Sequence, residues 1–149
     1  VVPVLMAFVP QLTGTSGNAG SQASVAVIRG LSLGEIELGD IFSVLWKEIR
    51  VSFLCGISLG LVNFIKMFIL NDVSRSVYGL EGSLMISFVV CLTMALTVVL
   101  AKIVGCTLPI IAKRIGLDPA VMASPFITSI VDALSLLIYF LFATVLLEI

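Results

Sequence analysis

The sequence predicts an all-α membrane protein, built as a bundle of transmembrane helices. Of its 149 residues, 60% are hydrophobic and only 11% are charged, and the mean hydropathy of +1.25 is well outside the range of soluble domains. The polar residues are also spaced so that four mainly apolar segments remain, each close to the roughly 20 residues that cross a bilayer. We therefore expect one transmembrane domain over residues 1–149, with no soluble domain.

The charge pattern argues against nucleic acid as a partner. The formal net charge is -1 and Lys and Arg form no long run, whereas a nucleic-acid site needs a basic patch. The three cysteines lie far apart in apolar segments, and the chain has no histidine, so we interpret them as small buried hydrophobic residues rather than metal ligands. The chain starts without Met inside an apolar run and lacks the features of a signal peptide, which indicates a fragment of a longer protein.

The first apolar segment, residues 1–31, contains a polar and glycine-rich stretch that we expect to interrupt its helix. The stretch reads "TGTSGNAGSQAS" and covers residues 13–24. Pro10, just before it, removes a helical hydrogen bond, so a kink or a break is expected there.

The same stretch supports two interpretations. Gly14, Gly17 and Gly20 fall at helical spacing, which favours close packing of helices in lipid. Alternatively, Ser16, Asn18, Gln22 and exposed backbone carbonyls line a polar path, because irregular backbone in a membrane requires polar surroundings. Both interpretations stay open at the level of sequence.

The other three apolar segments cover about residues 44–70, 84–112 and 119–147. We expect "LSLGEIELGDIF" to form a polar loop that leads into an amphipathic turn at the membrane surface, and "NDVSRSVYGLEGS" to form a second interfacial loop. In the third link, "KRIGLDP", Gly116 ends one helix and Asp118 is expected to cap the next. Lys and Arg are more frequent around the first and third links, which places those links in the cytoplasm and both chain ends outside.

One face of the fourth segment is polar. At about 100° per residue, the residues on this face are Ser124, Pro125, Thr128, Asp132, Ser135 and Tyr139. Asp132 is expected near the bilayer midplane, where an ionised carboxylate costs at least about 2.5 to 3.5 kcal/mol unless it is paired or hydrated. No Lys or Arg maps to that depth, so we expect a mobile cation as its partner; a protonated Asp132 bonded across a helix interface is the alternative.

Oxygen ligands are the donors that this chain offers, and they suit Mg²⁺, Ca²⁺ and Mn²⁺. One carboxylate is too little for a dehydrated divalent ion, whereas Mg²⁺ keeps several of its waters. We therefore hypothesise a symmetric dimer that brings two copies of Asp132 to one axis. Protons would compete with the ion for such a carboxylate pair, so transport is expected to weaken as pH falls.

Two stretches of the chain resemble the transmembrane domain of the MgtE family of magnesium channels. They are "LTGTSGNAGSQASVAVIRGLSLGEI" and "GLDPAVMASPFITSIVDALSLLIYF", and the resemblance extends over essentially the whole chain. It implies a homodimer with five transmembrane helices per subunit, the first of which is missing here, and a pore along the dimer axis. It also implies a bacterial plasma membrane, a last helix that ends outside, and cytoplasmic regulatory domains that close the pore at high Mg²⁺.

The resemblance assigns roles to particular residues. The pore carboxylate of the family matches Asp132, and the position whose carbonyl faces the ion matches Thr128. The residues that match the family motif on the helix beside the pore are Gly14, Gly17, Asn18, Gly20 and Gln22. The chain departs from the family pattern at Ser124, where Asn is expected, and at Ser16 and Ser21, where Gly and Asn are expected.

The expected function is Mg²⁺ transport through a dimeric pore, with Thr128 and Ser124 contacting the water shell of the ion at Asp132. The first alternative is a secondary transporter coupled to H⁺ or Na⁺, because a lone intramembrane carboxylate also suits a proton relay. No enzymatic activity is expected, since an aspartyl protease needs two carboxylates that share a proton. A purely structural membrane subunit is the remaining alternative, for which Asp132→Asn changes nothing.

Overall fold

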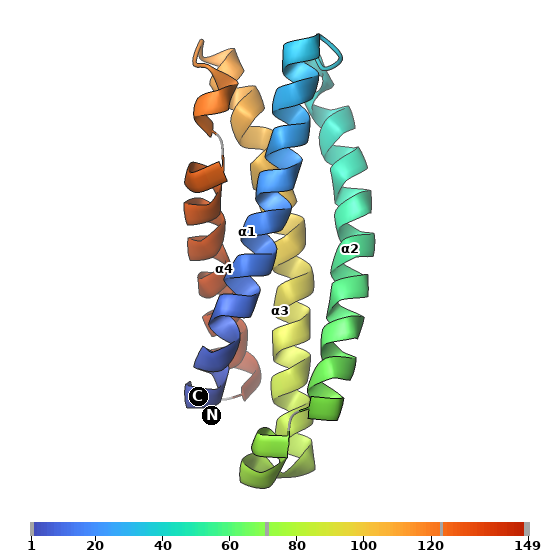
Figure 1. The fold of residues 1–149 in the computed structure, drawn as a ribbon, viewed down its shortest axis with the longest axis vertical. Helices are drawn as coiled ribbons and strands as arrows, with labels where there is room; N and C mark the ends of the chain where they lie inside the picture. The colour runs from blue at the N-terminus through green and yellow to red at the C-terminus, as the bar shows by residue number, and fades with distance from the viewer. Residues whose placement is uncertain (1, 71, 123, 148–149) are drawn as a thin grey trace.

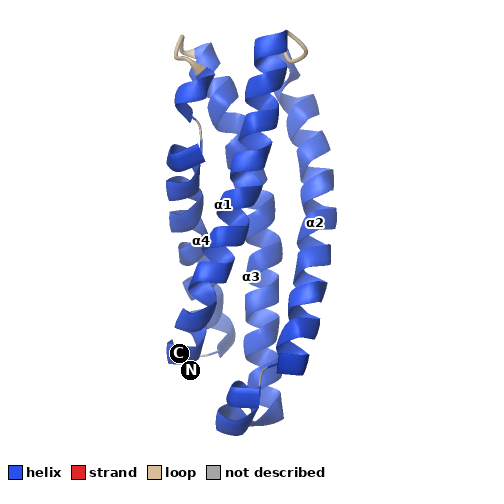
Figure 2. Cartoon of the chain, viewed as in Figure 1, coloured by secondary structure: helices blue, strands red, loops and turns tan. Residues whose placement is uncertain are grey.

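The computed structural model describes residues 2–70, 72–122 and 124–147, without the side chains of residues 2, 70, 72–78, 122 and 124. It forms a bundle of four helices (Figure 1): α1 (Val2–Leu33), α2 (Ile41–Leu70), α3 (Asp72–Arg114) and α4 (Ser124–Leu147). Successive helices run in opposite directions, so both marked chain ends lie at the same end of the bundle (Figure 1). The described part of the chain contains no strand (Figure 2). The all-α prediction is confirmed.

Three stretches of helix are long and apolar enough to cross a membrane: Leu38–Ile69, Gly79–Arg114 and Pro125–Leu147. α1 runs beside them over most of the height of the bundle (Figure 1), although its polar stretch makes it less apolar. Two of its polar side chains, Ser16 and Ser24, are buried inside the bundle. The chain is therefore an integral membrane protein in which α1 turns part of its polar face away from lipid.

α1 is continuous, so the expected interruption between residues 13 and 24 is wrong. The polar side chains of this stretch find partners within the helix: Thr13 donates to the carbonyl of Val9 and Ser16 donates to the carbonyl of Leu12. Pro10 also lies within the helix, on an exposed position, without ending it. Hydroxyl groups that bond to the preceding turn are a recognised way for membrane helices to accommodate such residues.

The helix boundaries differ from the expected ones at the links. Residues 72–78 form the first part of α3, which is kinked at Gly79 (φ 71°, ψ -177°). The prediction of a second interfacial loop is therefore wrong for most of its length. α4 begins at Ser124, five residues later than expected, because residues 119–122 form the separate 3₁₀ helix η2 (Pro119–Met122). The carboxylate of Asp118 accepts a hydrogen bond of 2.9 Å from the backbone of Ala120, which confirms its capping role, for η2 rather than for α4.

Two glycines end helices, and the prediction for Gly116 is confirmed. Gly34 (φ 72°) follows α1 and Gly116 (φ 82°) follows α3, both in the left-handed region. In each case the next residue donates its backbone N–H to a carbonyl near the end of the helix: Glu35 to Gly30 and Leu117 to Ala112, both at 2.9 Å. These are Schellman caps, which satisfy backbone carbonyls that have no partner in the helix.

α3 lies at the centre of the bundle and packs against the other three helices. Its crossing with α1 is very close, since a Cβ atom on Gly105 would overlap the carbonyl oxygen of Gly20. α2 approaches α3 through a row of small residues, in which a Cβ atom on Gly56 would lie 3.0 Å from the carbonyl oxygen of Ala95. Small residues permit such backbone contact and are the usual packing device of membrane helices.

Polar contacts supplement this packing between α2 and its neighbours. The ammonium group of Lys102 lies 3.3 Å from the carboxylate of Glu48, and both side chains are largely buried between α3 and α2. At the other end of α2, Gln11 of α1 donates to Asn63 at 2.6 Å and accepts from Lys66 at 2.9 Å. Polar side chains thus bond to one another where they would otherwise face lipid.

Candidate ion site

The candidate site is a groove between α1 and α4. Its cavity volume is about 250 Å³. The groove is lined by Pro10, Thr13, Gly14, Gly17, Asn18, Thr128 and Asp132. The α1 residues recur at intervals of three and four, and Thr128 and Asp132 are one turn apart on α4, so each helix presents a single face to the groove. The structure thus brings together five of the residues that the sequence singled out.

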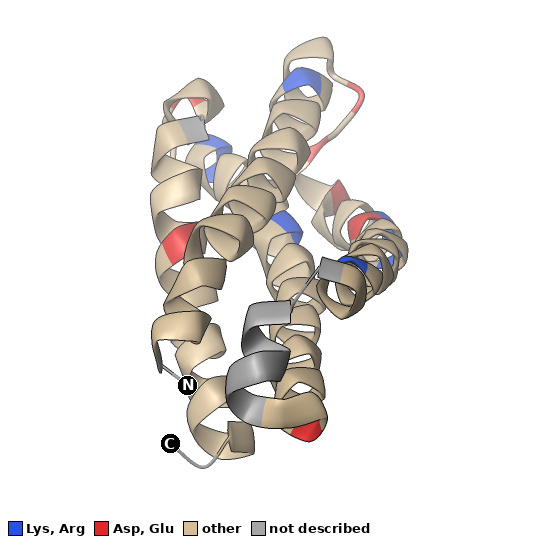
Figure 3. Cartoon of the chain, turned by 60° about the horizontal axis from the view of Figure 1, so that its bottom comes forward, with Lys and Arg blue, Asp and Glu red and all other residues tan. Residues whose placement is uncertain are grey.

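Asp132 is the one charged residue of α4 and lies away from both ends of Ser124–Leu147. Figure 3 shows how little of the bundle is acidic or basic. The side chain is half-buried, and its Oδ1 atom is covered and accepts no hydrogen bond from the described residues. Lys102 is not its partner, because that ammonium group pairs with Glu48. A covered carboxylate oxygen without a donor requires a proton, a water molecule or a cation.

Gly17 sets the distance between α1 and this carboxylate. A Cβ atom at Gly17 would lie 3.3 Å from Oδ1 of Asp132 and 3.3 Å from Cγ2 of Thr128. Such distances are tighter than ordinary van der Waals contact, so a larger residue would push the two helices apart or fill the groove. The missing side chain therefore leaves room at the carboxylate.

Gly20 and Gly14 differ from Gly17 in what surrounds them. A Cβ atom at Gly20 would lie 3.0 Å from the carbonyl oxygen of Ala101 and 3.2 Å from Cγ2 of Ile127, so Gly20 packs against α3 and α4. Nothing lies within 4 Å of such an atom at Gly14. The packing interpretation thus holds for Gly17 and Gly20, whereas Gly14 lies beside open space in the groove.

The remaining candidates lie at different places. Thr128 donates its hydroxyl hydrogen to the carbonyl of Pro125 at 3.0 Å, which leaves the lone pairs of its oxygen available at the groove. Gln22 lines a separate groove on α1 with Arg29 and is not brought to Asp132. Ser124 begins α4, and its side chain lies outside the described residues. Ser135 is buried and faces α1.

Two features near the site were not predicted from the sequence: the lining role of two α1 residues and the hydrogen-bond partner of Tyr139. Pro10 and Thr13 line the groove, and the available signal was that each lies four residues before a glycine, Gly14 and Gly17 respectively. Tyr139 is completely buried and donates its hydroxyl hydrogen to the carbonyl of Leu5 at 2.9 Å, which ties α4 to α1 below the groove. No pattern in the sequence identified this partner, because the two residues are far apart in the chain.

The sequence matches the model of the MgtE family, described as a divalent cation transporter, over residues 9–142. The chain belongs to the MgtE family. The matched range includes every residue that lines the groove between α1 and α4.

Three curated MgtE relatives are similar to this chain. The magnesium transporter MgtE of Bacillus subtilis is 33% identical over 147 residues, which cover 96% of this chain and 30% of the relative. That of Thermus thermophilus is 33% identical over 147 residues, covering 99% of this chain and 30% of the relative. That of Enterococcus faecalis is 30% identical over 138 residues, which cover 92% of this chain and 28% of the relative. The chain thus spans about 30% of the length of the curated relatives it matches.

Proposed function

We propose that residues 1–149 form the ion-conducting domain of a magnesium transporter, in which Asp132 attracts Mg²⁺ and Thr128 contacts its water shell. The observation that carries this proposal is the covered Oδ1 atom of Asp132, which has no donor among the described residues and lies in a polar groove. The names of the three relatives, all magnesium transporters, support the choice of ion. We propose transport, and no catalytic activity, on the same basis.

The open side of the groove suits an ion that keeps its water. Mg²⁺ demands octahedral geometry and loses water reluctantly. Because the groove is open on one side, a hydrated ion can enter it without losing its water shell. Thr128 and Asn18 would then contact the waters around the ion. The carboxylate of Asp132 would attract the ion through these waters, without binding it directly. The same oxygen donors accept Mn²⁺ and Ca²⁺, so the transport assay should include both.

The proposed pathway is completed by a second copy of the chain. The described residues contain no cluster of three or more metal-ligating side chains, so one chain supplies one carboxylate to the groove. Gly14 and Asn18 are exposed at its open side, where a second copy related by a twofold axis would add another Asp132. We therefore propose a homodimer with the pore at its axis, and Ser124 at the cytoplasmic mouth.

The placement in the cell follows from the same proposal. The distribution of Lys and Arg supports a cytoplasmic position for the first and third links, so the end of α4 faces outside. A bacterial plasma membrane agrees with the three bacterial relatives. Because these relatives are much longer than this chain, we propose that the full protein also carries cytoplasmic regulatory domains.

The test is Mg²⁺ uptake into proteoliposomes by the full-length protein that contains this chain. We expect Asp132→Asn to abolish uptake while the dimer stays intact, because the amide removes the charge that attracts the ion. The matched control is Asp118→Asn, which makes the same change at an exposed helix cap that Asn also serves well. Uptake that survives in Asp132→Asn would show that the pathway lies elsewhere.

A further inference from the structure

A buried pair of hydroxyl groups joins α1 to α4 next to the groove. Ser135 of α4 donates to Oγ of Ser16 at 2.8 Å, and Ser16 donates in turn to the carbonyl of Leu12 at 2.8 Å. The exposed fractions of Ser16 and Ser135 are 0% and 2%. The bond therefore links the side chain of α4 to the backbone of α1 in a place that solvent does not reach.

This bond lies within one turn of the proposed ion site on both helices. Ser135 follows Asp132 by three residues, and Ser16 directly precedes Gly17, whose missing side chain leaves room for the carboxylate. Residues three apart on a helix lie close to one face. A rotation of α4 about its axis would therefore move Asp132 and Ser135 together relative to α1.

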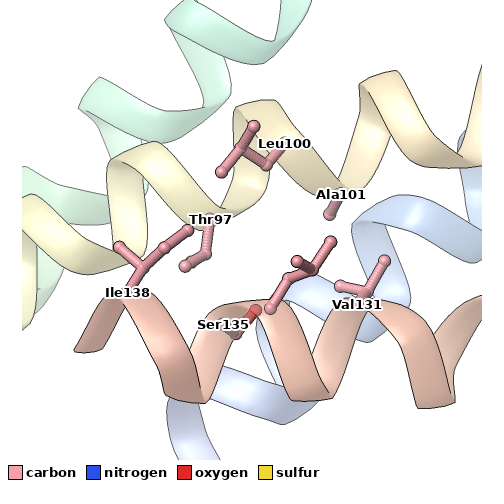
Figure 4. A pocket seen from close by; sticks show the side chains of 7 residues that line it. Thr97, Leu100, Ala101, Val131, Ser135 and Ile138 are labelled. Atoms are coloured by element: carbon pink, nitrogen blue, oxygen red, sulfur yellow. The ribbon is translucent and has the colours of Figure 1, made fainter. Parts of the chain in front are cut away.

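The surroundings of Ser135 leave it few other partners. Figure 4 shows the space beside it between α3 and α4, where Thr97 and Ala101 of α3 face Ser135 and Val131 of α4. This space is too narrow to hold a water molecule. The hydroxyl of Thr97 donates to the carbonyl of Met94. Ser16 is thus the partner that fixes Ser135 across the helix interface.

We propose that Ser16 and Ser135 are a pair of positioning residues, which holds α4 at the rotation that turns Asp132 into the groove. This inference rests on the proposed function of Asp132. The resemblance to the MgtE family implies glycine where this chain has Ser16, and a glycine would offer no hydroxyl.

The experiment measures Mg²⁺ uptake by the full-length protein in proteoliposomes, with the half-saturating Mg²⁺ concentration as the readout. One hydrogen bond between membrane helices contributes energy equivalent to about a threefold change in an equilibrium constant. We expect Ser16→Ala and Ser135→Ala each to raise the half-saturating concentration about threefold. The double variant should raise it no further, because both changes remove the same bond.

Two further variants separate positioning from packing. Ser135→Thr keeps the hydroxyl, so its half-saturating Mg²⁺ concentration should equal that of the original protein. Tyr139→Phe removes another bond between α1 and α4, and we expect it to lower the thermal unfolding midpoint without changing half-saturation. Where an alanine variant fails to fold, Ser16→Gly replaces it, because glycine also removes the hydroxyl that accepts the bond.

The outcomes distinguish this inference from the proposed function. If Asp132→Asn abolishes uptake but half-saturation is unchanged in both serine variants, the pair only packs and the positioning role is wrong. Equal shifts in Tyr139→Phe and Ser135→Ala would also overturn it, because they would indicate a general loss of stability. If Asp132→Asn leaves uptake unchanged, the proposed function fails and the positioning role fails with it.

Discussion

At the scale of single residues, the absence of one side chain is as important as the presence of a carboxylate. Gly17 lets α1 approach Asp132 and Thr128 closely, while Asp132 contributes the charge of α4. A glycine in a helix is less favourable than alanine by about 1 kcal/mol. The chain accepts this cost at a position where a methyl group would intrude on the groove.

Gly17→Ala should therefore weaken Mg²⁺ uptake, although alanine is the better helix former. The new methyl group would lie 3.3 Å from Oδ1 of Asp132, so the carboxylate has to shift by a few tenths of an ångström. We expect uptake to fall several-fold in proteoliposomes. Gly39→Ala is the matched control, because nothing lies within 4 Å of its new methyl group; equal uptake by both variants would contradict this account.

The sequence singled out central residues of the candidate groove but not its outline. Asp132 and Thr128 were found because a polar stripe in an apolar helix is conspicuous, and the glycines because of their helical spacing. Ser135 belongs to the same polar stripe, but it is buried against Ser16 and does not line the groove. Its position depends on how α4 is rotated. That rotation is set by packing against α1 and α3, which no local pattern encodes.

At the scale of helices, α2 offers a sensitive measure of packing because it approaches α3 through Gly56 and Gly60. A Cβ atom at Gly56 would lie 3.0 Å from the backbone oxygen of Ala95, whereas one at Gly60 would lie 3.6 Å from that of Cys91, an ordinary contact. The two glycines lie one turn apart, so they share their environment in other respects.

We predict that Gly56→Ala lowers the thermal unfolding midpoint of the protein in detergent and that Gly60→Ala does not. At Gly56 the methyl group meets rigid backbone, so α2 must move away from α3 and lose contact energy. At Gly60 the methyl group fits, and alanine favours the helix by about 1 kcal/mol. Similar midpoints for the two variants would show that α2 adjusts freely along α3.

The sequence predicted the number of helices and the caps at Gly116 and Asp118, since these depend on hydropathy and local backbone chemistry. It did not predict that α1 continues through residues 13–24 or that residues 72–78 are helical. Small and polar residues usually end helices in water. In α1 they instead bond to the preceding turn or pack against α3 and α4, so tertiary contacts override the local preference.

At the scale of the whole molecule, the proposed site is open on one side of the bundle. The groove contains a single carboxylate among the described residues, and Asn18 is exposed at its edge. A dimer that completes the site must place the two grooves face to face. Residues on the outer face of α2, such as Phe53, would then point away from the axis.

We predict that Asn18→Cys forms a disulfide between two copies of the chain in the membrane. The background should lack the native cysteines, Cys55, Cys91 and Cys106, all of which are free thiols. Mild oxidation followed by non-reducing electrophoresis should show a dimer for Asn18→Cys, because the two copies would meet there. Phe53→Cys, exposed on α2, should stay monomeric; the reverse result would place the interface on α2.

The late start of α4 has an electrical consequence. Asp132 lies eight residues after Ser124 and fifteen before Leu147, about a third of the way along the helix at 1.5 Å per residue. If the membrane voltage falls evenly along α4, an ion that follows the proposed pathway from the first residue of α4 crosses about a third of the field before it reaches the carboxylate. For a divalent ion this amounts to about 1.5 kcal/mol per 100 mV, so binding from that side depends less on voltage than binding from the other.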